Sequence, residues 1–186
     1  MPSSQYTRPK TDKETAMLDT THTLTESLRT FLTVPIQAGR DILVVCIGTD
    51  RSTGDSFGPF TGSLLESSTR YPYIYGTLLH PIHRQNFVAK TSFLCDRFVD
   101  PYIIAIDASL GSREHIGSIR VRRGSIRPAA AFTEDLPSIG DLAVTGIVGA
   151  SGAYDYHTLQ SARLGLVSHM ASQLATALSA VLPAST

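Results

Sequence analysis

The sequence predicts an α/β protein, a three-layer α/β/α sandwich built around a mostly parallel central sheet. Two continuous apolar and β-branched runs, 42–47 (ILVVCI) and 102–106 (YIIAI), are typical of strands that are covered on both faces. Segments in which apolar residues recur at helical spacing alternate with these runs along the chain. Alternation of strands and helices is the pattern of a sheet with helices on both faces.

Size and charge limit the classes of function. The 186 residues, 42% of them hydrophobic, suit one buried core. Sixteen Lys and Arg balance sixteen Asp and Glu, so no net field attracts nucleic acid or an anionic membrane. No apolar run is long enough to span a membrane, and the two cysteines lack metal-ligand spacing. We therefore expect a cytoplasmic protein that binds neither nucleic acid nor membrane; the pattern specifies no oligomeric state.

Composition divides the chain into two regions. Residues 1–20 are polar and rich in Ser, Thr and charge, which predicts a mobile N-terminal arm. Residues 21–186 are predicted to form a single domain with its core over 41–182. A short amphipathic helix over 21–33 is expected to lie on that core.

The remaining elements follow from apolar patterning and from Pro and Gly positions. The segment 116–121 alternates apolar and polar residues, as a half-exposed edge strand does. Residues 124–142 contain two prolines and two glycines and are predicted to form a long functional loop. Strands are expected over 42–47, 73–77, 102–106, 116–121 and 143–148, and helices after Pro59, over 87–98 and over 154–182.

Two aspartates stand where ligands gather in such sheets. Asp107 directly follows the strand 102–106, and Asp55 lies in the loop after the strand 42–47. Because the carboxyl ends of parallel strands share one edge, the two carboxylates can meet there. Such a pair can share a proton, activate a water or bind a metal. The structural alternative is that Asp55 caps the next helix and Asp107 accepts backbone N–H groups.

The loop after the first strand, GTDRSTGDSFGP, contains further candidates. Gly54 and Gly58, together with Gly48, would let backbone N–H groups approach an anion at a helix start. The loop lacks the GK[ST] ending of a nucleotide-binding loop. Asp50 and Arg51 are candidate substrate contacts, or they form a solvated turn.

Two other positions are candidate ligands. His83, with His80, could supply nitrogens to a metal that carboxylates already hold, although Pro81 interrupts the helical spacing that favours such a pair. Thr145, in the last expected strand, is a candidate substrate contact.

Four ordered segments, CIGTDRSTGDSFGP, YGTLLHPIHRQN, IIAIDASLG and LPSIGDLAVTGIVG, together resemble the YyaC family of sporulation proteins over about residues 41–182. That family is similar to the spore germination protease and, more remotely, to the hydrogenase maturation proteases. The resemblance therefore implies a phosphorylase/hydrolase-like fold.

The resemblance also implies an activity. In the germination protease the two catalytic aspartates lie in a loop of the form PDALGP and at a strand end of the form IDAL. The matching positions are Asp55 in GDSFGP and Asp107 in IDASL. The resemblance thus implies an endopeptidase in the spore or forespore interior, acting in sporulation or germination on protein or peptide substrates such as small acid-soluble spore proteins.

Two alternatives stay open at this point. In the hydrogenase proteases the matching acidic residues bind a metal, which implies a possible divalent metal held by Asp55, Asp107 and a histidine such as His83. Otherwise no cofactor is expected. The second alternative is a catalytically inactive spore protein that binds a peptide or small ligand in the same cleft.

Overall fold

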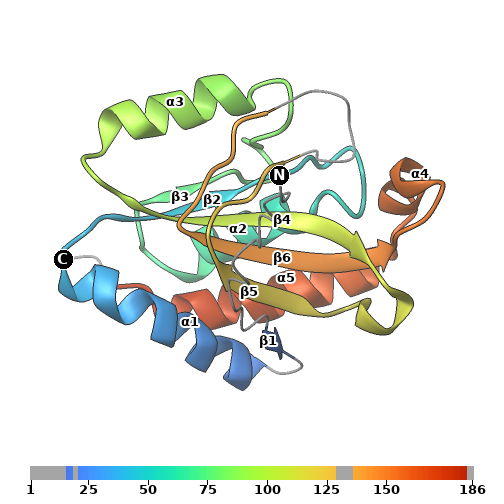
Figure 1. Cartoon of the computed structure of the whole chain (residues 1–186), viewed down its shortest axis with the longest axis horizontal. Helices are drawn as coiled ribbons and strands as arrows, with labels where there is room; N and C mark the ends of the chain where they lie inside the picture. Colours follow the sequence, from blue (N-terminus) through green and yellow to red (C-terminus); the bar gives the residue numbers. More distant parts are fainter. Residues whose placement is uncertain (1–15, 19–20, 129–135, 184–186) are drawn as a thin grey trace, which may run out of the picture.

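The computed structural model describes residues 16–18, 21–128 and 136–183. Its six strands form one sheet in the order β1-β5-β6-β4-β2-β3 (Figure 1). The strands are β1 (Ala16–Leu18), β2 (Ile42–Cys46), β3 (Ile74–Tyr75), β4 (Tyr102–Gly111), β5 (Ile119–Arg123) and β6 (Leu142–Ala150). The helices are α1 (Thr21–Gln37), α2 (Phe57–Ser68), α3 (Phe87–Arg97), α4 (Asp155–Gln160) and α5 (Leu164–Ser179), with one 3₁₀ turn, η1 (Arg113–His115).

The sheet is mostly parallel, as predicted. Strands β3, β2, β4 and β6 pair in parallel, whereas β5 and β1 add antiparallel pairings at one side. Parallel neighbours need crossover connections, and α2 and α3 supply them on either side of β3. The carboxyl ends of the four parallel strands therefore point to the same edge of the sheet.

Helices cover both faces of the sheet, which confirms the three-layer arrangement. In Figure 1, α3 lies on one side of the sheet, and α1 and α5 lie on the other. The larger core joins α1, α2 and α5 to alternate strand residues such as Val44 and Ile104. The smaller core joins α3, through Phe87 and Leu94, to strand residues such as Val45. No helix in the described parts of the chain is long and apolar enough to cross a membrane.

Strand β4 is longer than the sequence predicts. It continues through Asp107 to Gly111, so Asp107 does not follow the strand end but lies within the strand. The extension exists because β6 pairs alongside it as far as Gly111, with a register shift between Ser109 and Leu110. Residues 102–107 are buried and residues 108–111 are partly exposed. Asp107 is thus the last buried residue of the strand.

Three further expectations differ from the structure. Residues 16–18, predicted as part of a mobile arm, form β1, which pairs with β5; β5 is therefore not the edge strand. The rest of the arm, and residues 129–135 of the predicted loop, lie outside the described residues. The helix expected over 154–182 is two helices, because the chain leaves α4 after Gln160 and α5 begins at Leu164, packing against α2.

Candidate functional site

A cavity of about 400 Å³ opens at the carboxyl ends of the parallel strands. Its lining includes four side chains that the sequence singles out, namely Asp55, His83, Asp107 and Thr145. The volume lies in the range of small-ligand sites. The sheet therefore brings these four residues to one place, which the strand-end argument predicts for Asp55 and Asp107.

The pairing of β4 with β6 places Asp107 in the cavity. Asp107 lies directly opposite Thr145, so both side chains point to the same face of the sheet. The side chain is 9% exposed, and its Oδ1 accepts the Ala108 N–H at 2.9 Å. Burial raises the pKa of Asp107 well above its usual value, the charge of Asp55 raises it further, and the Ala108 N–H lowers it. Asp107 therefore keeps its proton at pH values where an exposed aspartate is ionised.

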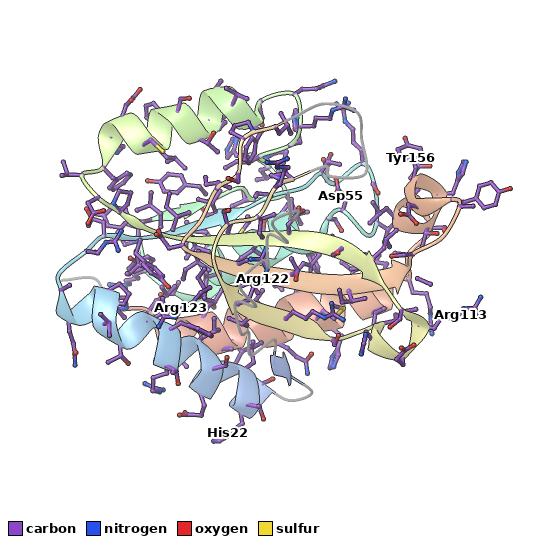
Figure 2. The ribbon with its side chains drawn as sticks, viewed as in Figure 1. His22, Asp55, Arg113, Arg122, Arg123 and Tyr156 are labelled. Carbon is purple, nitrogen blue, oxygen red and sulfur yellow. The ribbon has the colours of Figure 1, made fainter. Side chains whose placement is uncertain are left out.

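The loop between β2 and α2 carries Asp55 over the end of the sheet. The Thr49 N–H donates to the Asp55 carbonyl oxygen at 3.2 Å, so the loop folds back on its own start. Gly48 adopts φ +138°, and a Cβ there would lie 1.9 Å from the Asp55 carbonyl oxygen. Only glycine permits this approach. Figure 2 shows Asp55 at the end of the sheet near α4.

The structural alternative for Asp55 does not hold. Helix α2 takes Ser56 as its N-cap residue, without a capping bond from a side chain. Burial raises the pKa of Asp55, while the Thr49 backbone N–H and the nearby His83 lower it. For Asp107 the only influence that lowers the pKa is the Ala108 N–H. Asp107 is therefore the member of the pair whose protonated form is favoured more strongly.

The loop before α3 presents His83 to the cavity. The Asn86 side chain holds this loop, because its Oδ1 accepts the His83 N–H at 2.9 Å and its Nδ2 donates to the Pro81 carbonyl at 3.0 Å. The Gln85 N–H donates to His83 Nδ1 at 3.3 Å. His80 is exposed and does not line the cavity.

The residues of the cavity do not fit the metal site that the resemblance implies. Within 16–18, 21–128 and 136–183, no three or more His, Cys, Asp or Glu side chains are arranged to hold a metal ion. Asp55, Asp107 and His83 thus line one cavity but do not form such a group.

Gly54 and Gly58, two of the three glycines predicted to bind an anion, have a packing role instead. The Gly54 N–H donates to the Leu159 carbonyl at 2.8 Å, and a Cβ on Gly58 would lie 2.1 Å from the Ile47 carbonyl oxygen. The N–H groups of Ser56 and Phe57 also donate to carbonyls within the loop. Neither glycine lines the cavity. The N–H groups of Gly48, Gly54, Ser56 and Phe57 thus already donate to carbonyls of the protein, so the structure does not support the predicted anion cradle.

Asp50 and Arg51 also lie outside the cavity lining. Both residues are exposed, and Thr49 Oγ1 contacts Asp50 Oδ1 at 3.4 Å and accepts the Arg51 N–H at 3.3 Å. They form a solvated turn, so their predicted role as substrate contacts is not supported.

Three arginines that line the cavity were not identified as candidates from the sequence. Arg84, Arg122 and Arg127 come from three different segments and line the same cavity as the aspartates. The alternation of apolar and polar residues over 116–121 continues through β5 and places Arg122 among the polar positions. Only the register of β5 with its neighbour shows which face of the sheet that side chain occupies.

Comparison with known proteins places the chain in a family. The model of a family described as a protein of unknown function (DUF1256) matches residues 16–177. The chain belongs to this family. It is also 46% identical over 144 residues to the uncharacterized protein YyaC of Bacillus subtilis (strain 168). The alignment covers 76% of this chain and 70% of that protein. The resemblance to YyaC that the four segments indicate is thus confirmed.

The backbone is also similar to that of a solved structure. The NiFe hydrogenase maturation protease HycI from Thermococcus kodakarensis KOD1 matches with a TM-score of 0.48 and 18% sequence identity. The match covers 76% of this chain and 91% of that chain.

Proposed function

We propose that this DUF1256 protein is an aspartate-dependent peptidase that acts in sporulation or germination, inside the spore or forespore. One observation carries the proposal: two carboxyl groups line one cavity, and the buried one, Asp107, is kept protonated partly by the charge of the other, Asp55. A neutral acid beside a carboxylate is the arrangement that general acid–base hydrolysis requires. The biological setting rests on the resemblance to the YyaC family.

The pair supplies the proton transfers of both steps of peptide hydrolysis. In the first step Asp55 takes a proton from water as the water oxygen bonds to the carbonyl carbon, and Asp107 gives its proton to the carbonyl oxygen. In the second step Asp55 gives its proton to the leaving nitrogen as the C–N bond breaks. Asp107 then recovers a proton from a hydroxyl of the collapsing intermediate. The pair ends in its starting state, with Asp107 neutral and Asp55 charged.

The test is hydrolysis of acid-extracted small spore proteins by the purified protein. Asp55→Asn and Asp107→Asn should each lower the rate by roughly 10²–10⁴-fold, the usual contribution of a positioned acid or base. Asp50→Asn is the matched control, because it removes an exposed carboxylate from the same loop without touching the cavity. Hydrolysis by both cavity variants at the parent rate would contradict the proposal.

One observation favours a second candidate, a catalytically inactive protein that binds a peptide in the same cavity. The N–H groups of Gly54, Ser56 and Phe57 donate to carbonyls of the protein, so this loop offers no oxyanion site through them. This candidate is supported if the parent protein hydrolyses none of the spore proteins while a peptide still binds and Asp107→Asn changes its affinity.

A further inference from the structure

Strand β4 extends past the end of its neighbour β2. The last residue of β2, Cys46, is opposite Ile106, and the following Ile47 N–H donates to the Ile106 carbonyl at 2.7 Å. Beyond that bond β4 continues to Gly111 with β6 alone as its partner. Figure 1 shows β4 and β6 side by side, running toward α4. Among the residues that the structure describes, no strand therefore pairs with the other edge of β4 from Asp107 onward.

The backbone of β4 turns Ala108 and Leu110 toward this open edge. The N–H and C=O groups of successive residues in a strand point alternately to its two neighbours. The Ile106 carbonyl is bonded on the β2 side, whereas the Gly111 carbonyl, beyond the register shift, accepts the Ser151 N–H at 2.8 Å on the β6 side. Even-numbered residues of β4 thus face β2 and odd-numbered residues face β6. The backbone groups of Ala108 and Leu110 therefore point into the space beyond the end of β2.

One acceptor and one donor on this edge have no backbone partner. The Ala108 N–H already donates to Asp107 Oδ1 at 2.9 Å, and Ser109 Oγ donates to the Leu110 carbonyl at 3.2 Å. In the described segments, the Ala108 carbonyl and the Leu110 N–H make no bond on the β2 side. Both residues are partly exposed and line the cavity. The free groups of a strand edge are a template for a further strand.

We propose that the edge of β4 from Ala108 to Leu110 binds an extended segment of the substrate peptide as an added parallel strand. In a parallel ladder, one residue donates its N–H to a carbonyl of the neighbouring strand and accepts the N–H that lies two residues further on. The Ala108 carbonyl and the Leu110 N–H are such a pair, so one substrate residue, the anchor residue, satisfies both. An antiparallel strand pairs the N–H and C=O of the same residue, and at Ala108 that N–H is already used by Asp107. The peptide is thus recognised by its backbone.

The added strand would lie in line with β2 and beside the aspartates. The chain after β2 leaves that line, since the Gly48 N–H donates to the Ile82 carbonyl on the side away from β4. The anchor residue lies opposite Ser109, about 4.8 Å away, and the substrate residue two positions earlier lies opposite Asp107. The hydrolysed bond should therefore lie within two residues on the N-terminal side of the anchor residue. Only this position rests on the proposed peptidase function; the backbone pairing does not.

Binding of N-methylated peptides tests the pairing without any hydrolysis. Random decapeptides are selected for binding to the Asp55→Asn variant, and the tightest binder is synthesised with a fluorophore and with an N-methyl group at each residue in turn. One position, the anchor residue, should lose affinity by about 10-fold or more, because the Ala108 carbonyl then has no donor. Methylation of the next residue, whose N–H points away from β4, should leave the affinity nearly unchanged.

Leu110→Pro tests the same pairing from the side of the protein. Proline removes the free N–H of Leu110, which is not part of the ladder with β6, so the strand can keep its pairing. Leu110→Ala is the matched control, because it removes the leucine side chain and retains the N–H. In the Asp55→Asn background, Leu110→Pro should bind the peptide about 10-fold more weakly than Leu110→Ala. N-methylation of the anchor residue should also matter less in Leu110→Pro, because both bonds hold the same residue.

The outcomes separate the added strand from the peptidase. One methyl-sensitive position and weaker binding by Leu110→Pro, without hydrolysis by the parent protein, support the strand and contradict the peptidase. Hydrolysis of spore proteins by the parent, with a peptide whose affinity no N-methyl group lowers, overturns the strand and leaves the peptidase standing. Equal methyl sensitivity in Leu110→Pro and Leu110→Ala also overturns the strand, as does recovery of no binder. If circular dichroism shows that Leu110→Pro does not fold, the N-methyl series on Asp55→Asn decides alone.

Discussion

At the scale of single residues, Asp107 is a carboxyl group whose surroundings stabilise its neutral form. It is buried, it accepts one backbone N–H, and it faces the charge of Asp55. Burial and the charge of Asp55 favour the protonated acid, whereas the N–H group favours the carboxylate. The same environment that suits an acid catalyst therefore lowers the stability of the fold once the proton leaves, a common relation between active sites and stability.

This relation predicts how stability changes with pH. The pKa of Asp107 is raised in the folded state, so between the unfolded and folded pKa values the folded protein holds more protons. The stability that the proton provides is complete below the unfolded pKa and is lost as pH rises through the folded pKa. Asp107→Asn, which cannot ionise, should therefore raise Tm at neutral pH, by roughly 2–4 °C for each kcal/mol gained.

Thermal unfolding of the parent and Asp107→Asn across pH measures the effect. The gain in Tm should shrink as pH falls toward the unfolded pKa, where the parent is also protonated. Asp50→Asn, in the solvated turn, should show no comparable dependence on pH. A lower Tm for Asp107→Asn at neutral pH, unchanged in acid, would show that the Asp107 carboxylate stabilises the fold.

At the scale of elements, close backbone packing holds the loop that carries Asp55. The start of α2 rests directly on the chain after β2, since a Cβ on Gly58 would lie 2.1 Å from the Ile47 carbonyl oxygen. The loop is also bonded to α4 through the Gly54 N–H. The position of the carboxylate therefore depends on residues that touch no ligand.

Gly58→Ala tests this dependence. The added methyl group must push α2 away from β2, so we expect destabilisation of about 1–3 kcal/mol, typical of overpacking, together with loss of hydrolysis. Gly165→Ala is the control, because a Cβ at Gly165 in helix α5 meets nothing within 4 Å. It should leave stability unchanged or raise it by up to about 1 kcal/mol, since alanine favours the helix. Denaturant unfolding and hydrolysis assays of both variants give the comparison. Equal free energies of unfolding for the two variants would mean that the loop and α2 can move to accommodate the methyl group without loss of stability.

The elements also differ in how well the sequence predicts them. Strand β2 was clear because both of its faces are buried, so every residue is apolar. The end of β4 was missed because Ala108–Gly111 carry no apolar run and are held by pairing with β6. The break before α5 was missed because helical spacing of apolar residues continues across it.

The candidate site was predictable to a similar, partial extent. Asp55 and Asp107 follow from their place after buried runs and from the motifs GDSFGP and IDASL. Arg122 does not, because its place in the cavity lining depends on register with β6 and on the turn at Gly124. The glycines of the Asp55 loop were assigned to anion binding because composition does not reveal which N–H groups already have partners.

At the scale of the whole molecule, the two sides of the sheet are covered unequally. One side carries α1, α2 and α5 over the larger core. The other carries α3, which buries Phe87, Thr91 and Leu94 and exposes Val88 and Phe93. Segments with few buried apolar contacts open at lower free energy than the rest of a protein. Helix α3 and the preceding loop, which holds His83, should therefore open before the sheet unfolds.

Leu94→Ala should enhance this local opening. Removing a buried leucine side chain typically costs about 2–5 kcal/mol, here from contacts between α3 and the sheet. Hydrogen exchange should accelerate across residues 81–97 while α5 keeps its protection, as long as α3 opens separately. Leu174→Ala, an equally buried change in α5, should instead reduce protection throughout the sheet, because it weakens the larger core. If Leu94→Ala lowers the protection of α5 as much as that of α3, the two layers unfold as one cooperative unit, and His83 then stays beside Asp55 for as long as the protein is folded.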